Sequence, residues 1–310
     1  MEQEEISAVC TDPVILDQWH VISALDEITA GAVHETLLLD EPVSFASSAD
    51  GELSVWRSTT DLPVGAPVDL GSVGRPLPVK PAYGFLWTSL GDPPPDLFAM
   101  PDHDNPRRRN MNAGSVMVAT SAPRAVENFL DLGHFPYVHS DVLGVLPHTE
   151  VADYDVDIVD GEIIATKCDF YVPVAALNRG PAMTRYRYRV PHPYCVMLYY
   201  DTRTDPALED VIALFIQPMS EERVRAHNYM GVIDDDSSDN QIKVYQLLIF
   251  GQDKPILENQ NPKRLPLDPR AETPIRADKS AIVYRRWLSD LGVTYGVIPA
   301  DDGATAGRNP

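Results

Sequence analysis

Residues 127–139 read ENFLDLGHFPYVH. This stretch places two histidines, His134 and His139, in an apolar frame together with the polar side chains of Asn128 and Asp131. Neutral imidazole is the commonest metal ligand in proteins. Two imidazoles and one distant carboxylate form the facial triad that holds non-haem Fe(II) with open coordination positions. The stretch therefore predicts two ligands of a divalent metal site, and the third ligand must come from elsewhere in the chain.

The sequence before His134 predicts a helix that begins near residue 122. Ser121 suits the N-cap, Pro123 suits the first turn, and apolar side chains follow at helical spacing. The first histidine continues this apolar face. Pro136 removes a backbone donor and should kink or end the helix, so that both imidazole rings can converge.

Two carboxylates complete the predicted site. Asp131 lies three residues before His134, on the same side of the predicted helix, where it can accept a hydrogen bond from that imidazole. Asp253 lies in a second predicted helix, from about residue 240 to residue 260, on its apolar side. A buried carboxylate is unfavourable unless it is paired, protonated or bound to a metal. Asp253 is therefore the expected third ligand.

Two other interpretations of these residues stay open. Two histidines close together on one helix are often simply packed or solvated, although Asp131, Pro136 and Asp253 together favour a metal site. Zinc is the second alternative, because two histidines and one carboxylate also suit a catalytic zinc site. The residues alone do not choose the metal.

Both segments resemble the iron-binding signature of the catalytic subunits of Rieske non-haem iron oxygenases. Residues 249–260, IFGQDKPILENQ, are similar to the family helix that supplies the third ligand, and residues 17–20 and 83–87 resemble the start and end of the family's N-terminal domain. The resemblance implies a mononuclear Fe(II) centre with O2 as co-substrate, in a helix-grip domain whose curved antiparallel sheet wraps around a long helix. It assigns the iron ligands to His134, His139 and Asp253, with Asn128 and Asp131 hydrogen-bonded around them.

The chain departs from the family pattern at the Rieske cluster. That cluster needs two cysteines and two histidines, in C-x-H and C-x-x-H arrangements. The three cysteines are Cys10, Cys168 and Cys195, and none of them is followed by histidine at either spacing. In place of the cluster loops stands Ser58 to Pro81, which is rich in Pro, Gly and Val and is predicted to form turns and short extended pieces. We therefore expect a degenerate Rieske-like all-β module with no intrinsic iron–sulfur cluster.

Within the family, the chain resembles the cluster-lacking oxygenase subunits of bacterial N-demethylases, including those that act on 7-methylxanthine. Residues 284–288, YRRWL, and 293–296, VTYG, add to this likeness. It implies that electrons come from a separate NAD(P)H-dependent reductase or ferredoxin with a Rieske centre, and that Asp131 is the catalytic residue coupling this path to a ligating histidine. It further implies oxidative N-demethylation of a small methylxanthine-like ring, with release of formaldehyde, by a homotrimer or hetero-oligomer.

Two functions of other classes remain as alternatives. One is a non-catalytic ligand-binding or scaffolding subunit of an oxygenase complex, whose cavity would carry an apolar ligand. The other is a zinc hydrolase. The retention of all three candidate ligands argues against the non-catalytic subunit, whereas metal analysis and a test for an oxygen requirement would distinguish the zinc hydrolase.

Composition agrees with a globular enzyme. The 310 residues are 44% hydrophobic, which is normal for a protein with a full core. The formal net charge of −21 disfavours nucleic acid and anionic membrane surfaces as partners. The acidic N-terminus and the absence of a long apolar run predict a cytoplasmic protein without signal peptide or membrane span. The three cysteines are expected to be buried free thiols.

The pattern of elements predicts an α+β chain that divides near residue 100. We expect a degenerate Rieske-like β domain at 1–100, the helix-grip catalytic domain at 101–300 and a flexible tail at 301–310. Residues 92–110 are predicted to be a connection whose arginine run, 107–109, is a solvated turn or docks a partner. Strands are expected at 33–39, 42–47, 52–57, 83–89, 154–159, 162–170, 185–190, 195–200, 211–217 and 223–233, and a last helix at 278–291.

Overall fold

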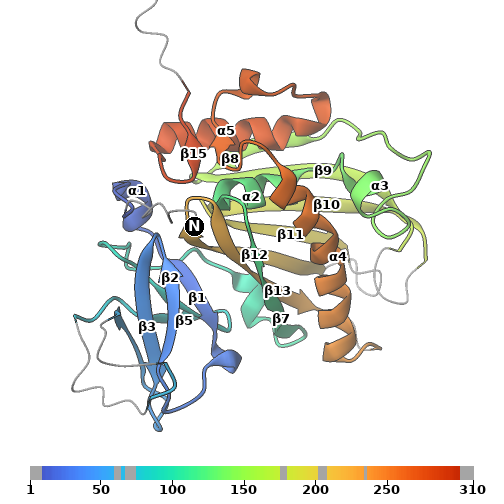
Figure 1. Ribbon diagram of the computed structural model, residues 1–310. Coiled ribbons are helices and arrows are strands. Elements are labelled where there is room, and N and C mark those ends of the chain that lie inside the picture. The colour runs from blue at the N-terminus through green and yellow to red at the C-terminus, as the bar shows by residue number, and fades with distance from the viewer. Residues whose placement is uncertain are drawn as a thin grey trace, which may run out of the picture.

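The computed structural model describes residues 9–58, 64–66, 75–174, 180–201, 208–233 and 236–300. Its largest element is a seven-stranded sheet in the spatial order β7-β13-β12-β11-β10-β9-β8 (Figure 1). Every neighbouring pair of strands in this sheet is antiparallel. The strands are β7 (Arg109–Val118), β8 (Asp155–Val159), β9 (Glu162–Val172), β10 (Ala182–His192), β11 (Cys195–Asp201), β12 (Glu209–Ser220) and β13 (Arg223–Val232).

The sheet has two faces because successive side chains of a strand point in opposite directions. On β11 and β12 one face carries Met197 and Phe215, which pack with Trp87 of the N-terminal region. The other face carries Leu198 and Ile212, which line a cavity. The sheet is therefore the middle layer of the molecule.

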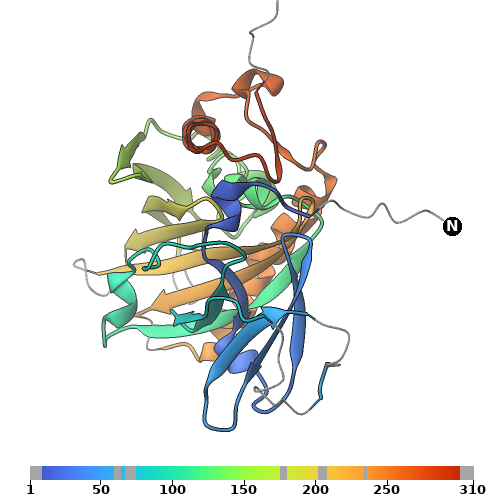
Figure 2. The same cartoon turned by 90° about the vertical axis from the view of Figure 1, so that its left-hand side faces the viewer.

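The N-terminal strands form two small sheets that lie beside β12 (Figures 1 and 2). Gln217 of β12 ties them to the large sheet by donating its amide to the Thr36 hydroxyl at 2.7 Å and to the Leu37 carbonyl at 2.8 Å. One small sheet has the order β1-β6-β5 and the other β2-β3-β4. Their strands are β1 (His20–Ala24), β2 (His34–Leu38), β3 (Glu41–Ser47), β4 (Leu53–Arg57), β5 (Lys80–Ala82) and β6 (Phe85–Thr88).

Helices cover the cavity side of the large sheet. The longest is α4 (Asp239–Asn259), which begins with a capping box between Ser238 and Gln241. It approaches β7 so closely that a Cβ on Gly114 would lie 3.3 Å from the Leu247 side chain, and Gly114 has a φ of +93°. The remaining elements are α1 (Pro13–Leu16), α2 (Ala122–Leu130), α3 (Phe135–Val138), α5 (Lys279–Leu291), the strands β14 (Leu265–Pro266) and β15 (Val297–Ile298), and 3-10 helices at Leu25–Glu27, Pro101–Asp104, Pro269–Ala271 and Arg276–Asp278.

The mixed α and β architecture with antiparallel sheets confirms the predicted fold class. Each predicted strand is present with ends that differ by at most three residues, and the helices expected at about 240–260 and at 278–291 are α4 and α5. The three cysteines are buried and free, as expected. No described helix combines the length and the hydrophobicity needed to cross a lipid bilayer.

The prediction of a solvated connection at residues 92–110 was wrong for the last residues of that segment. Arg108 is buried, pairs with Asp102 at 3.3 Å and donates to the Gly231 carbonyl at 3.1 Å, so the middle of the arginine run belongs to the packed structure, while Arg107 is exposed. The edge strand β7, which begins at Arg109, was not expected. The division near residue 100 stays a prediction, while residues 59–63, 67–74 and the predicted tail at 301–310 lie outside the described residues.

A buried cluster of charges joins α2 to α5. Glu127 of α2 accepts from Arg285 of α5 at 2.6 Å and from Arg124 at 3.1 Å. Glu272 accepts from both arginines, at 2.6 Å from Arg124. Hydrogen bonds to Arg124 and Arg285 outweigh desolvation and lower the pKa of Glu272 to about 2. The cluster fixes the helix that leads into residues 127–139.

We expect Arg285→Leu to lower the free energy of unfolding by about 3 kcal/mol, because it leaves Glu127 as a buried charge without its main partner. The adjacent Arg286 is exposed, so Arg286→Leu serves as the matched control and should change stability by less than about 0.5 kcal/mol. Urea denaturation of the three proteins measures both effects. Equal stability of the Arg285 variant and the wild type would show that the cluster does not hold the helices together.

Candidate metal centre

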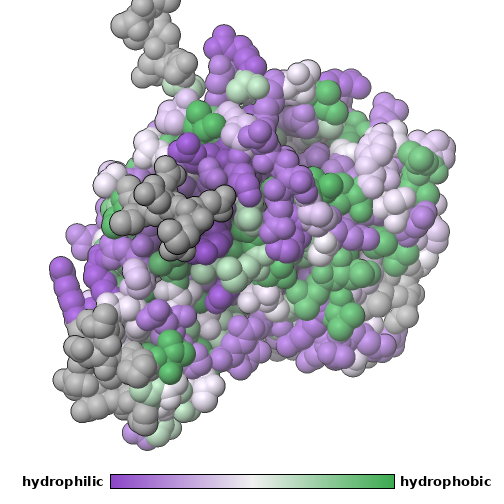
Figure 3. All heavy atoms as spheres, in the orientation of Figure 1, coloured by the Kyte–Doolittle hydropathy of each residue, from purple (hydrophilic) through white to green (hydrophobic). Residues whose placement is uncertain are grey.

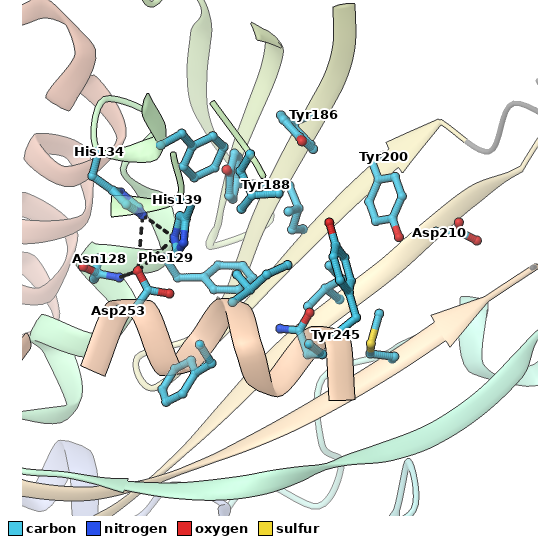
Figure 4. A pocket seen from close by; sticks show the side chains of 18 of the residues that line it. Asn128, Phe129, His134, His139, Tyr186, Tyr188, Tyr200, Asp210, Tyr245 and Asp253 are labelled. Carbon is cyan, nitrogen blue, oxygen red and sulfur yellow. Dashed lines mark hydrogen bonds and ion pairs between the residues drawn. The ribbon is translucent and has the colours of Figure 1, made fainter. Parts of the chain in front are cut away.

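Three side chains from distant parts of the sequence converge between α3 and α4 (Figure 4). The Nε2 atoms of His134 and His139 lie 3.1 Å apart. Asp253 Oδ1 lies 3.3 Å from the first of these nitrogens and 3.1 Å from the second. Among the described residues, this is the one group of three or more His, Cys, Asp or Glu side chains arranged to hold a metal ion. The structure thus brings together the three residues predicted as ligands.

The chain turns sharply between the two histidines. α2 ends at Leu130 because Asp131 leaves the helical conformation, with ψ at 119°, and its carboxylate accepts the Gly133 N–H at 2.7 Å. His134 then caps the start of the single-turn helix α3, and His139 caps its end. The expectation that one helix runs as far as Pro136 and kinks or ends there was wrong. Pro136 instead lies in the first turn of the second helix, where proline is well tolerated.

Helix α4 supplies the third group from its buried face. Asp253 lies on the same face as Ile242, Gln246, Phe250 and Leu257, so the apolar surroundings predicted for this carboxylate are present. Not every apolar residue near Asp253 lies on this face, since Ile256 is 45% exposed.

Each converging side chain is held by one further hydrogen bond. Asp131 Oδ2 lies 3.2 Å from His134 Nδ1, as predicted, and the Asn128 amide donates to Asp253 Oδ1 at 3.1 Å. Gln252 Oε1 lies 2.9 Å from His139 Nδ1. The sequence analysis missed Gln252, although its position next to Asp253 was a signal that it could reach the same site.

These hydrogen bonds leave three lone pairs facing one another. When Nδ1 of each ring donates to Asp131 or Gln252, each Nε2 is an unprotonated acceptor. Two such nitrogens and the Asp253 oxygen then meet with no proton between them, and this arrangement is repulsive unless a cation lies among them. The donor set and its geometry therefore fit a divalent metal ion.

The electrostatics of the cluster agree with this need for positive charge. Burial lowers the pKa of His134, but hydrogen bonds to Asp131 and Asp253 outweigh it and raise that pKa to about 9. Burial raises the pKa of Asp253, but its bonds to both histidines prevail and lower it to about 2. Donor atoms about 2.1 Å from an octahedral ion lie about 3.0 Å from their neighbours, close to the separations found here.

A cavity between α4 and the large sheet opens on the triad. Its near end is apolar, since Phe135 contacts both histidine rings, with ring centroids 5.0 Å from His134 and 6.0 Å from His139. Its far end is polar and carries Tyr200, Asp210 and Tyr245 (Figure 4). The full lining comprises Asn128, Phe129, His134, Phe135, His139, Leu143, Tyr186, Tyr188, Leu198, Tyr200, Asp210, Ile212, Met230, Val232, Ile242, Tyr245, Gln246, Ile249, Phe250 and Asp253.

A second, more polar cavity of about 230 Å³ lies on the other side of Asn128. Asp131 lines this cavity together with the charged cluster of Arg124, Glu127, Glu272 and Arg285. Asn128 lines both cavities. The Asp131 carboxylate, which contacts His134, therefore faces the second cavity and not the apolar end of the first.

Comparisons with known proteins agree with this arrangement. The model of the vanillate O-demethylase oxygenase C-terminal domain matches residues 118–293. The probable methylxanthine N7-demethylase NdmC of Pseudomonas sp. (strain TJI-51) is 42% identical over 285 residues, which are 91% of this chain and 96% of that protein.

Solved structures show the same fold. NdmA of Pseudomonas putida CBB5, with caffeine, superposes with a TM-score of 0.72 at 19% identity over 89% of this chain and 90% of its own. Dicamba monooxygenase bound to dicamba gives a TM-score of 0.68 at 17% identity over 89% of this chain and 97% of its own. The family model spans the triad, and the relative that is 42% identical covers nearly the whole chain. The chain belongs to the Rieske non-haem iron oxygenase family, as an oxygenase subunit of the demethylase type.

Proposed function

We propose that the chain binds Fe(II) through His134, His139 and Asp253 and oxidatively removes a methyl group from the nitrogen of a small methylxanthine-like ring. The convergence of three metal-binding atoms at the apolar end of a cavity carries this proposal. A bound ferrous ion would supply the activation of O2. The names of the relatives, which include methylxanthine demethylases, support the substrate class.

The reaction balances with electrons from outside. Hydroxylation places one oxygen atom of O2 in a C–H bond of the N-methyl group, and the other leaves as water with two electrons and two protons. The N–CH2OH product then breaks its C–N bond to give formaldehyde and a ring N–H. Phe129 and Phe135 keep water from the methyl group at the apolar end, while the polar end accommodates the heteroatoms of the ring.

We propose that the chain holds no electron store of its own, and the positions of its cysteines support this. Cys168 is on β9 and Cys195 is on β11, and β10 lies between these strands, which are about 10 Å apart. The strand pairing places Cys168 level with Tyr200, so the two cysteines lie even farther apart than the strands. Two thiolates at this distance cannot bind one iron. Cys10 lies in the N-terminal region, which we propose to be a degenerate Rieske-like module within residues 1–100. The catalytic domain would then span residues 101–300.

Electrons would therefore arrive from a separate Rieske-containing reductase or ferredoxin. Asp131 supports this role, because its carboxylate contacts His134 on one side and lines the polar cavity on the other. In this proposal Asp131 couples the incoming electron path to the ligating imidazole, and Asn128 orients the Asp253 carboxylate.

An apolar surface on α4 supports assembly with other chains. Val244 is 58% exposed and Leu248 is 55% exposed on the outer face of this helix. Figure 3 shows hydrophobic surface gathered over this part of the molecule. Exposed apolar patches of this kind are typical of protein interfaces. We propose a homotrimer or a hetero-oligomer on this basis.

Purified protein loaded anaerobically should contain about one iron per chain, and His134→Ala should lose it. The variant removes a ligand whose Nε2 faces the other two, so the remaining pair cannot hold the ion tightly. Elemental analysis after gel filtration measures the content. His148→Ala is the matched control, because His148 is exposed and stacks on Tyr171 away from the triad, and this variant should keep its iron.

The loaded protein should release formaldehyde from an N-methylxanthine only when a Rieske-containing reductase and NAD(P)H are present. Parallel assays of formaldehyde and demethylated ring measure the activity. Asp131→Asn should keep the iron and lower the rate by about 100-fold, because the amide weakens the contact with His134. Turnover of the wild type with a small chemical reductant but not with the Rieske protein would contradict the proposed partner.

Two tyrosines on β10 offer a matched pair for testing substrate binding. Tyr186 lines the cavity between Phe135 and Tyr200, and its hydroxyl makes no hydrogen bond with any residue that the structure describes. The Tyr188 hydroxyl is sealed from solvent and has no partner in the described structure. Tyr186→Phe should weaken methylxanthine binding about fivefold, the effect of one lost hydrogen bond. Calorimetric titration should show no weakening for Tyr188→Phe.

A further inference from the structure

The two imidazoles of the triad are held by different kinds of group. His134 Nδ1 contacts a carboxylate, that of Asp131, at 3.2 Å, whereas His139 Nδ1 contacts the neutral amide oxygen of Gln252 at 2.9 Å. We infer that Gln252 is a positioning residue, which fixes His139 for metal binding without adding a negative charge to the site. The inference rests on the proposed metal assignment.

His139 depends on this contact more than His134 depends on its own. The His139 side chain is 2% exposed, whereas that of His134 is 13% exposed. Water therefore cannot replace Gln252 as the acceptor for the buried His139 Nδ1–H. Donation to Gln252 selects the tautomer in which Nε2 carries the free lone pair, and it sets the rotation of the ring toward Asp253.

The position of Gln252 in the chain makes the contact precise. Gln252 and the ligand Asp253 are adjacent on α4, so one helical turn both supplies the third ligand and orients the second. Pro255 follows within the helix and lacks the N–H that would bond the Gly251 carbonyl four residues earlier. A helix that lacks this backbone hydrogen bond can bend locally, and two consecutive side chains can then point toward one centre.

Charge explains why an amide serves here better than a carboxylate. With Asp131 and Asp253 ionised, a divalent ion makes the centre formally neutral. A carboxylate in place of Gln252 would add a third negative charge within hydrogen-bond distance of a ligand. This charge would favour the ferric over the ferrous ion and would lower the reduction potential of the centre.

Metal affinity of three variants tests the inference. Gln252→Met keeps the length of the side chain but removes the acceptor, and Co(II) binding, measured by competition with a chromophoric chelator, should weaken by about 10- to 100-fold. Gln252→Glu restores an acceptor, so it should bind Co(II) at least as tightly as the wild type and show a lower Fe(III)/Fe(II) potential in a redox titration. Asn240→Met, at an exposed amide in the first turn of the same helix, should bind like the wild type.

Each outcome decides a separate point. The melting temperature of the metal-free Gln252→Met protein shows whether the variant folds, and a folded variant that binds Co(II) as tightly as the wild type overturns the inference. It is also overturned when Gln252→Glu binds as weakly as Gln252→Met, because the acceptor is then not what matters. A wild-type chain that binds no Co(II) refutes the proposed metal assignment, and this inference with it.

Discussion

The meeting of three lone pairs between α3 and α4 is the constraint to which the surrounding structure responds. Two imidazole nitrogens and a carboxylate oxygen lie 3.1 to 3.3 Å from one another. Unless a proton or a metal ion lies among them, these atoms repel one another, and rigid elements on both sides keep them in place. The charged cluster of Arg124, Glu127, Glu272 and Arg285 fixes α2 on one side. The capping box and the close approach to β7 fix α4 on the other.

The large sheet contributes by having two different faces. Residues of one parity on β11 and β12 pack on the N-terminal strands, and residues of the other parity face the cavity. On β10 two outward arginines pair with acidic residues of β9, Arg185 with Asp169 at 2.7 Å and Arg189 with Glu162 at 2.5 Å, while Tyr186 and Tyr188 point inward. The sheet that forms one wall of the cavity is therefore packed on both of its faces, and α4 forms the opposite wall.

Sequence patterns pointed to the three side chains that converge but not to the groups that support them. His134, His139 and Asp253 were found because ligand-type residues stood at apolar positions, and the start of α2 followed from Ser121 and Pro123. The end of α2 was missed, because the Asp131 carboxylate accepts a local hydrogen bond from the Gly133 N–H. This bond competes with helix propagation and leaves no periodic signal in the sequence.

Tertiary placement accounts for the other differences. Gln252 meets His139 only when α4 lies across the sheet, and nothing in its own neighbourhood specifies that meeting. The sequence of β7 has asparagines and a glycine where alternation would mark a strand. A glycine at position 114 allows the Leu247 side chain of α4 to pack closely against the strand, and this requirement comes from tertiary packing and not from the sheet.

The position of Asn128 affects how other molecules can reach the three converging side chains. Its side chain lines the apolar cavity and the polar cavity alike, so it lies at the boundary between the two spaces. In the proposed reaction, a ring that enters the apolar cavity and a reductant that approaches the polar cavity would therefore reach the centre from different sides. A donor protein could stay docked through successive turnovers while small molecules are exchanged behind it.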